Sequence, residues 1–227
     1  MSDVLLEIIA FDIASCSLIG ANGGNRIELC ANPLEGGTTV SYGMMKAARS
    51  AASIPIFPII RPRGGDFLYN AEEFEVMRKD VMLARDCGMD GVVLGLLTAN
   101  RSVDYDRTAA LVELAYPMEV TFHRAFDEIE DYLPALELVI TAGCNRILTS
   151  GGKPTVMEGL DRLKHCVEAA NDRIIVLPGS GIRASNIQSI RDTLGLAEYH
   201  SSARYQSANG TSSLDVNELK ALRQALS

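Results

Sequence analysis

The sequence predicts one α/β domain, a TIM-type (β/α)8 barrel of parallel strands that spans residues 1–227. Eight short runs rich in Val, Ile and Leu recur along the chain, and their starts lie about 22 to 36 residues apart, the length of one strand and one helix. The segments between them carry apolar residues at helical spacing. No GxGxxG string follows the first run, which disfavours an open doubly wound sheet. Eight strand–helix units therefore favour a closed barrel.

The elements follow in chain order. The predicted strands are residues 4–11, 26–30, 55–63, 91–97, 118–126, 146–150, 174–178 and 197–202. The clearest predicted helices are residues 71–87, 132–142, 156–170 and 185–194. A Gly or Asn before four of the strands is typical of a left-handed helix end. The barrel covers about residues 4–204, and a polar loop at 205–213 and a closing helix at 214–225 complete the domain.

Composition and charge narrow the classes of function. The chain has 29 Asp and Glu residues against 21 Lys and Arg residues, a net charge of −8, whereas a general nucleic-acid binder needs a basic surface. The longest uncharged run, residues 13–25, is too short to span a bilayer, and the start MSDVLLEIIA lacks the basic segment of a signal peptide. Five cysteines without a CxxC indicate reduced thiols. We expect a cytoplasmic protein with no nucleic-acid or membrane partner.

Polar residues occupy strand positions that should face the barrel interior. In residues 26–30, Ile27 and Leu29 should face the helices, which directs Glu28 and Cys30 into the lumen. The first strand also offers Glu7, but apolar residues on both sides leave its direction open.

A cluster of titratable residues should meet at the carboxyl ends of the strands, where the active sites of barrels lie. The catalytic candidates are Glu28, Arg61, His123 and His200. The carboxylate and the imidazoles suit proton transfer, and the arginine suits an anion. The alternative is an ion-pair plug in which these charges only satisfy one another.

Loops at the same end of the barrel favour an anion. The segment IRPRGGDF places Arg63 beside two glycines, and barrels commonly bind phosphate with the loops after strands seven and eight. The candidate anion-binding residues are Arg63, Gly151, Gly179, Gly181, Ser201 and Ser202.

Two of the five cysteines could reach the same end of the barrel. Cys16 follows the first strand and Cys30 ends the second, so their thiols could approach each other, and thiolates select Cu(I) or zinc. No CxxC, HxH or MxxM spacing completes a ligand set. The other three cysteines are expected to pack in the apolar interior.

Several long strings resemble those of a known family. RIELCANPLEGGTT, IPIFPIIRPRGGDFLY, VTFHRAFD, RILTSGG, PGSGI and EYHSSAR are similar, in this order, to signature segments of the CutC family of copper homeostasis proteins. The resemblance implies a cytoplasmic (β/α)8 barrel that forms a homodimer or larger homo-oligomer, is tied to copper tolerance and binds Cu(I). It also implies that Cys30 is the copper-linked position. It implies no organic cofactor.

Two hypotheses of function follow. In the first, the protein is a cytosolic copper homeostasis factor that binds Cu(I) through Cys30, with Cys16, His123 or His200 as further ligands. In the second, it is a lyase, isomerase or hydrolase acting on a small anionic or phosphorylated metabolite, with Glu28 and His123 exchanging a proton and His200 as an alternative acid. A scaffold without catalysis is a third, simpler interpretation.

Overall fold

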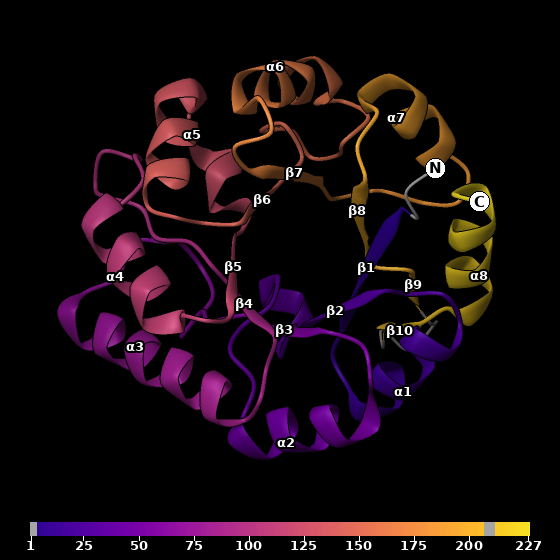
Figure 1. The fold of residues 1–227 in the computed structure, drawn as a ribbon, viewed down its shortest axis with the longest axis horizontal. Coiled ribbons are helices and arrows are strands. Elements are labelled where there is room, and N and C mark those ends of the chain that lie inside the picture. Colours follow the sequence, from indigo (N-terminus) through magenta and orange to yellow (C-terminus); the bar gives the residue numbers. More distant parts are fainter. Residues whose placement is uncertain (1–3, 207–211) are drawn as a thin grey trace.

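The computed structural model describes residues 4–206 and 212–227, and it has the predicted barrel. Eight parallel strands surround the central axis and the helices surround the strands (Figure 1). The strands are β1 (Leu5–Ala10), β2 (Arg26–Leu29), β3 (Ile56–Pro58), β4 (Gly91–Leu94), β5 (Glu119–Phe122), β6 (Arg146–Thr149), β7 (Ile175–Pro178) and β8 (Glu198–Ser201). The helices are α1 (Ile13–Ala21), α2 (Tyr42–Ala51), α3 (Ala71–Asp86), α4 (Tyr105–Ala115), α5 (Tyr132–Thr141), α6 (Leu160–Ala170), α7 (Ile187–Leu194) and α8 (Val216–Ala225).

The strands close in sequence order. One ladder runs β3-β2-β1-β8 and the other β4-β5-β6-β7. Parallel bridges between Ile59 and Val93 and between Gly179 and His200 join the two ladders. Outward-facing strand residues such as Leu6, Ile8 and Ile27 are fully buried against the helices, so the main apolar core is the layer between strands and helices.

The turns that precede several strands share one device. The side chains of Asn25, Asp90 and Asn145 accept hydrogen bonds from the backbone N–H groups of the preceding strands, at 2.8 to 2.9 Å. Gly23, Gly88, Gly143 and Asn171 have positive φ, as the turn sequences predict. The helices begin at side-chain caps, among them Asn70 in a capping box with Glu73.

Several predicted boundaries differ from the structure; the fourth strand, for example, ends at Leu94, and the helix predicted at 156–170 begins at Leu160. The third strand is shorter than residues 55–63, because its prolines cannot donate to a ladder. The fifth strand ends at Phe122 and continues as a 3-10 helix, Arg124–Glu128. The predicted loop at 205–213 begins and ends in an antiparallel pair of short strands, β9 (Arg204–Gln206) and β10 (Ser212–Leu214), and its remainder lies outside the described residues. No helix within residues 4–206 and 212–227 is long and apolar enough to cross a membrane.

Candidate active site

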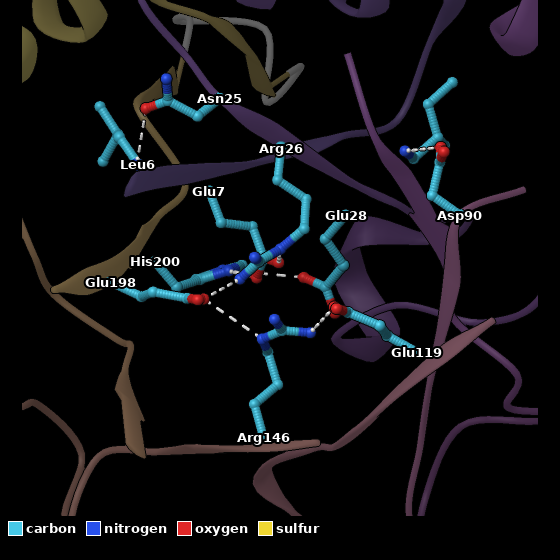
Figure 2. Close-up of polar contacts among 11 residues, drawn as sticks. Leu6, Glu7, Asn25, Arg26, Glu28, Asp90, Glu119, Arg146, Glu198 and His200 are labelled. Atoms are coloured by element: carbon cyan, nitrogen blue, oxygen red, sulfur yellow. Dashed lines mark hydrogen bonds and ion pairs between the residues drawn. The ribbon is translucent and has the colours of Figure 1, made fainter. Parts of the chain in front are cut away.

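The amino-terminal half of the lumen is filled by a network of ion pairs (Figure 2). Glu7 on β1 lies opposite Arg26 on β2 in the strand register and accepts a hydrogen bond from its Nε. Arg26 also donates to Glu198 at 2.6 Å, and Arg146 donates to Glu198 at 3.2 Å and to Glu119 at 2.7 Å. Both guanidinium groups lie over the ring of Phe57. These partners compensate the charges of the two buried arginines.

The network continues to His200 and Glu28 (Figure 2). Glu7 is also the register partner of His200, and its Oε1 lies 2.7 Å from His200 Nδ1. The other ring nitrogen, Nε2, lies 3.7 Å from Oε2 of Glu28. Glu7 therefore fixes the orientation of the imidazole that faces Glu28.

Charge counting explains the protonation states of these groups. Glu7, Glu198 and Glu119 face Arg26, Arg146 and His200, which leaves Glu28 as the carboxyl without a cation of its own in this network. Burial raises the pKa of Glu28 to about 7, against the attraction of His200.

The pKa of Glu7, on the other side of His200, shifts in the opposite direction from that of Glu28. Burial opposes ionisation of Glu7, but the Arg26 charge and the hydrogen bond from His200 outweigh it and lower the pKa of Glu7 to about 2. Burial also lowers the pKa of His200, but its hydrogen bond to Glu7 and the charges of Glu28 and Glu7 outweigh it and raise that pKa overall. Glu28, with a pKa of about 7, thus lies beside an imidazole whose pKa is also raised.

A cavity of about 280 Å³ opens above this pair at the carboxyl ends of the strands. Its lining residues are Ile9, Glu28, Gly36, Ile59, Arg61, Phe67, His123, Arg124, Leu148, Ser180, Gly181, His200 and Ser202. All four predicted catalytic residues thus meet in one pocket of the size of a small metabolite. The histidine beside Glu28 is His200; His123 lies elsewhere on the wall of the pocket, against Phe67 and Ala125.

Arg61 reaches the pocket wall from the end of β3. Its guanidinium donates to the backbone carbonyls of Glu35, Gly37 and Gly65, and its Nε is buried without a hydrogen-bond partner among the described residues. Within the described residues Arg61 forms no salt bridge with a carboxylate, so its charge makes the potential at the pocket wall more positive. Arg63, two residues on, instead pairs with Glu73 and Asp66 and does not line the pocket.

The glycine- and serine-rich loops contribute unequally. Gly181 and Ser202 line the cavity. Gly151 and Gly179 do not, and their N–H groups donate to the side chain and the carbonyl of Thr149. The hydroxyl of Ser201 is buried and donates to the carbonyl of Ile182.

The turn after β6 already holds a carboxylate of the chain itself. Asp127 accepts hydrogen bonds from the N–H groups of Ser150 and Gly152 and from the hydroxyl of Thr149. The donors that suggested an anion site there are used to dock the 3-10 helix after β5.

The two candidate metal ligands lie in different apolar clusters. Cys16 on α1 belongs to the layer between strands and helices, and burial raises the pKa of its thiol to about 11. Cys30 lies inside the lumen with Phe57, Ile59 and Val93, and burial raises its pKa well above the usual value. Within the described ranges, no group of three His, Cys, Asp or Glu side chains is placed to hold a metal ion.

Several site residues were missed from the sequence. Arg26 and Arg146 share strand parity with Glu28 and Leu148, so the same alternation could have found them. Arg124 follows His123 on the 3-10 helix, where strand alternation no longer applies, and Phe67 comes from the loop before α3.

Comparison with known proteins places this chain in a family. The sequence profile of the CutC family matches residues 4–205. This chain belongs to the CutC family. A CutC family protein from Chromobacterium violaceum is 46% identical over 99% of this chain and 98% of its own length. The human protein named copper homeostasis protein cutC homolog is 44% identical over 88% of this chain and 73% of its own length.

Solved structures agree with this assignment. The CutC protein from Streptococcus agalactiae has 33% sequence identity and a TM-score of 0.83, over 88% of this chain and 98% of that one. A thiamine phosphate pyrophosphorylase from Pyrococcus furiosus has 16% identity and a TM-score of 0.65, over 98% of this chain and 95% of that one. The second likeness concerns the barrel fold alone.

Proposed function

We propose that the protein serves copper homeostasis, the role after which its mouse and human relatives are named, as a barrel enzyme rather than as a copper carrier. Its pocket takes a small anionic or phosphorylated metabolite, and Glu28 and His200 transfer a proton on it. The reaction is of the lyase, isomerase or hydrolase type. The observation that supports this most strongly is Glu28, a buried carboxyl that opens onto the pocket and has a pKa of about 7.

Glu28 is suited to general acid–base catalysis for two reasons. Its pKa lies close to neutral pH, where a group can both take and return a proton. Its neighbour His200 is held in one orientation by Glu7, so the pair forms a carboxyl–imidazole–carboxylate chain from the pocket to the buried network. His200 exchanges the proton with Glu28, and Glu7 positions His200.

Two arginines at the pocket wall support an anionic substrate. Arg61 lines the cavity with a guanidinium group that backbone carbonyls hold in place by hydrogen bonds. Arg124 lines the cavity from the 3-10 helix. Gly181 and Ser202 stand on the loops after β7 and β8, where barrels commonly place an anion.

A screen of small carboxylates and phosphorylated metabolites for binding and turnover tests this proposal. We expect one class of small anion to raise the Tm of the wild-type protein. In Arg124→Met, an about tenfold higher concentration of that anion should be needed for the same rise in Tm. Arg63→Met is a matched control, because Arg63 is similarly exposed and also ion-paired but lies outside the pocket. Glu28→Gln should keep binding and lose turnover. Loss of binding in Arg63→Met but not in Arg124→Met would contradict the assignment of the pocket.

The second candidate function is direct binding of Cu(I), which the names of the mammalian relatives favour. Cys30 is then the principal ligand, because its thiol lies in the lumen near the pocket, whereas Cys16 is turned toward the helix layer. The high pKa of the Cys30 thiol disfavours thiolate formation without a metal.

Anaerobic titration with Cu(I) against a competing chelator separates the two candidates. One tight equivalent per chain that is lost in Cys30→Ser and kept in Cys16→Ser would establish direct binding. If the wild-type protein binds Cu(I) no more tightly than Cys30→Ser and Cys16→Ser do, direct copper binding is contradicted. The enzyme is then the explanation of the role in copper homeostasis.

We also propose that the protein works in the cytoplasm and as a homo-oligomer. All five cysteines are buried free thiols, which suits a reducing compartment. Leu34 and Tyr116 are large apolar side chains that are 92% and 79% exposed, and contact with a second copy would cover such groups. Light scattering after gel filtration tests the assembly: a mass near 24.5 kDa would contradict it.

A further inference from the structure

His123 is held in one tautomer by the backbone that follows it. The residue follows β5 directly and caps the 3-10 helix, and its Nδ1 accepts a hydrogen bond of 3.2 Å from the N–H of Ala125. A neutral imidazole carries one proton, so that proton is on Nε2. His123 therefore presents an N–H donor at its far nitrogen.

That donor has no acceptor within the described part of the protein. Nε2 of His123 is buried and without a hydrogen-bond partner there, the residue is 4% exposed, and it lines the pocket that Glu28 also lines. A buried donor left unpaired destabilises the folded protein. A polar atom of a bound molecule can supply the missing acceptor.

The surroundings keep His123 neutral and immobile. Burial, together with the charge of Arg61, lowers its pKa to about 3. The centroid of the Phe67 ring lies 4.9 Å from that of the imidazole. The guanidinium of Arg61 in turn lies over the Phe67 ring. Just after β4, the strand that pairs with β5, a Cβ at Gly95 would lie 2.4 Å from Nδ1, so only glycine leaves room for this ring.

A neutral, fixed imidazole N–H has a specific use in a pocket with a base. It cannot accept a proton at Nε2, but it can donate a hydrogen bond to a carbonyl oxygen and stabilise the oxyanion that forms there. No lysine side chain lines this pocket within the described residues, so this N–H and the arginines are its means of polarising a carbonyl group.

We propose that the substrate is an anionic carbonyl compound and that the reaction begins with its enolisation, which rests on the proposed function of the pocket. The Glu28 carboxylate removes a proton from the carbon next to the carbonyl. The C–H electron pair becomes the carbon–carbon double bond, and the carbonyl π electrons move to oxygen, where Nε2–H of His123 stabilises the enolate. The proton held by Glu28 then returns to the same carbon, which restores the carbonyl group. Where that carbon carries a hydroxyl group, the hydroxyl proton passes to the enolate oxygen, and the proton held by Glu28 goes instead to the former carbonyl carbon, so that the carbonyl group moves to its neighbour.

Two simple dianions separate this inference from anion binding in general. Oxalate is planar and resembles an enolate of a small keto acid, whereas malonate has a saturated central carbon. We expect the wild-type protein to bind oxalate at least about tenfold more tightly than malonate. We expect His123→Phe to bind the two alike. His165→Phe, which removes an exposed histidine on α6, is the control and should keep the preference.

A measurement on the wild-type protein guards against misfolding of the variant. In ¹⁵N-histidine-labelled protein, oxalate should move the Nε2–H signal of His123 downfield, and malonate should leave it in place. Equal affinities, or a preference that survives in His123→Phe, would overturn the enolisation proposal while malonate binding upholds the anion pocket. If neither dianion binds, both the inference and the anionic substrate are contradicted.

Discussion

Nε2 of His200 lies 3.7 Å from Oε2 of Glu28, at the point where the buried ion-pair network meets the pocket (Figure 2). The opposite nitrogen of the ring is hydrogen-bonded to Glu7, so the imidazole cannot turn away from Glu28 without losing that bond. One side of this histidine is therefore held by the buried network and the other faces the pocket. Under the proposed function, the ion-pair plug and the catalytic cluster are compatible, because the plug holds the proposed catalytic pair in place.

Glu28→Gln should change stability in a pH-dependent way. Because the pKa of Glu28 is raised from 4.5 to about 7 on folding, its contribution to stability is fully present below about pH 4.5 and is lost as the pH rises through 7. The variant has no such loss, so it should gain stability relative to wild type by up to roughly 3 kcal/mol between about pH 4.5 and pH 8.5. Urea unfolding at a series of pH values measures the difference.

An exposed carboxyl provides the control for this titration. Glu75 on α3 is half exposed and pairs with Arg78, and Glu75→Gln should follow the wild-type curve. A Glu28→Gln curve that runs parallel to wild type from acid to alkaline pH would show that Glu28 has an ordinary pKa.

Glu7→Gln should destabilise the barrel and release His200. The substitution deprives Arg26 of one of its two carboxylates in a fully buried position, which typically costs about 3–5 kcal/mol. The pKa of Glu7 is lowered to about 2, so its contribution is present above about pH 4.5 and lost as the pH falls toward 2. The pKa of His200 is raised, so its share is present in acid and lost as the pH rises through the raised value.

The loss in Glu7→Gln should therefore be largest between about pH 5 and the raised pKa of His200. NMR titration of the His200 ring should also give a lower pKa in the variant than in wild type. An unchanged pKa of His200 would mean that Glu7 does not control this imidazole.

Gly95→Ala should displace the His123 ring, although the substitution adds only one methyl group. The new methyl group would lie 2.4 Å from Nδ1 of His123 and 3.2 Å from Cβ of Ala125, so the ring must leave its hydrogen bond to Ala125. Overpacking of this kind typically costs about 1–3 kcal/mol. Thermal unfolding together with the Nε2–H signal of His123 measures both effects.

Gly43→Ala is the matched control, since Gly43 lies on α2 with only Ser41 near its Cβ position. Alanine in a helix is favoured over glycine by up to about 1 kcal/mol, so this variant should be as stable as wild type or more so. Equal behaviour of the two variants would show that the space around His123 is not tight.

Asp127→Asn should loosen the turn after β6. The carboxylate accepts from two backbone N–H groups and from Thr149, and hydrogen bonds to a charged group contribute about 1.5–3 kcal/mol each. We expect a loss of roughly 2–4 kcal/mol in unfolding experiments and faster hydrogen exchange at Gly152. Protection at Gly152 equal to that of wild type would contradict the role assigned to Asp127.

Strand alternation predicted the lumen well where one face of a strand is clearly apolar. In RIEL the outward Ile27 and Leu29 identify Glu28, and the same parity places Arg26. In LLEIIA apolar residues stand on both faces, because the lumen itself needs Leu5 and Ile9 beside Glu7, so alternation could not place that glutamate.

Loop chemistry was harder to predict, since it depends on contacts between distant segments. The TSGG turn has the composition of an anion cradle, but Asp127 from the preceding strand–helix unit occupies its donors. Arg63 and Arg61 stand two residues apart in one motif, yet Glu73 draws the first away from the pocket and three carbonyls hold the second at its wall.

The central claim is that Glu28 exchanges a proton near neutral pH at the floor of the pocket. A ¹³C NMR titration of glutamate-labelled protein, with the Glu28 carboxyl assigned by its absence in Glu28→Gln, tests this directly. We predict a midpoint near 7 for this carboxyl, because its burial raises the pKa more than the charge of His200 lowers it. A midpoint near the ordinary value of 4.5, or no titration up to about pH 9, would contradict the account.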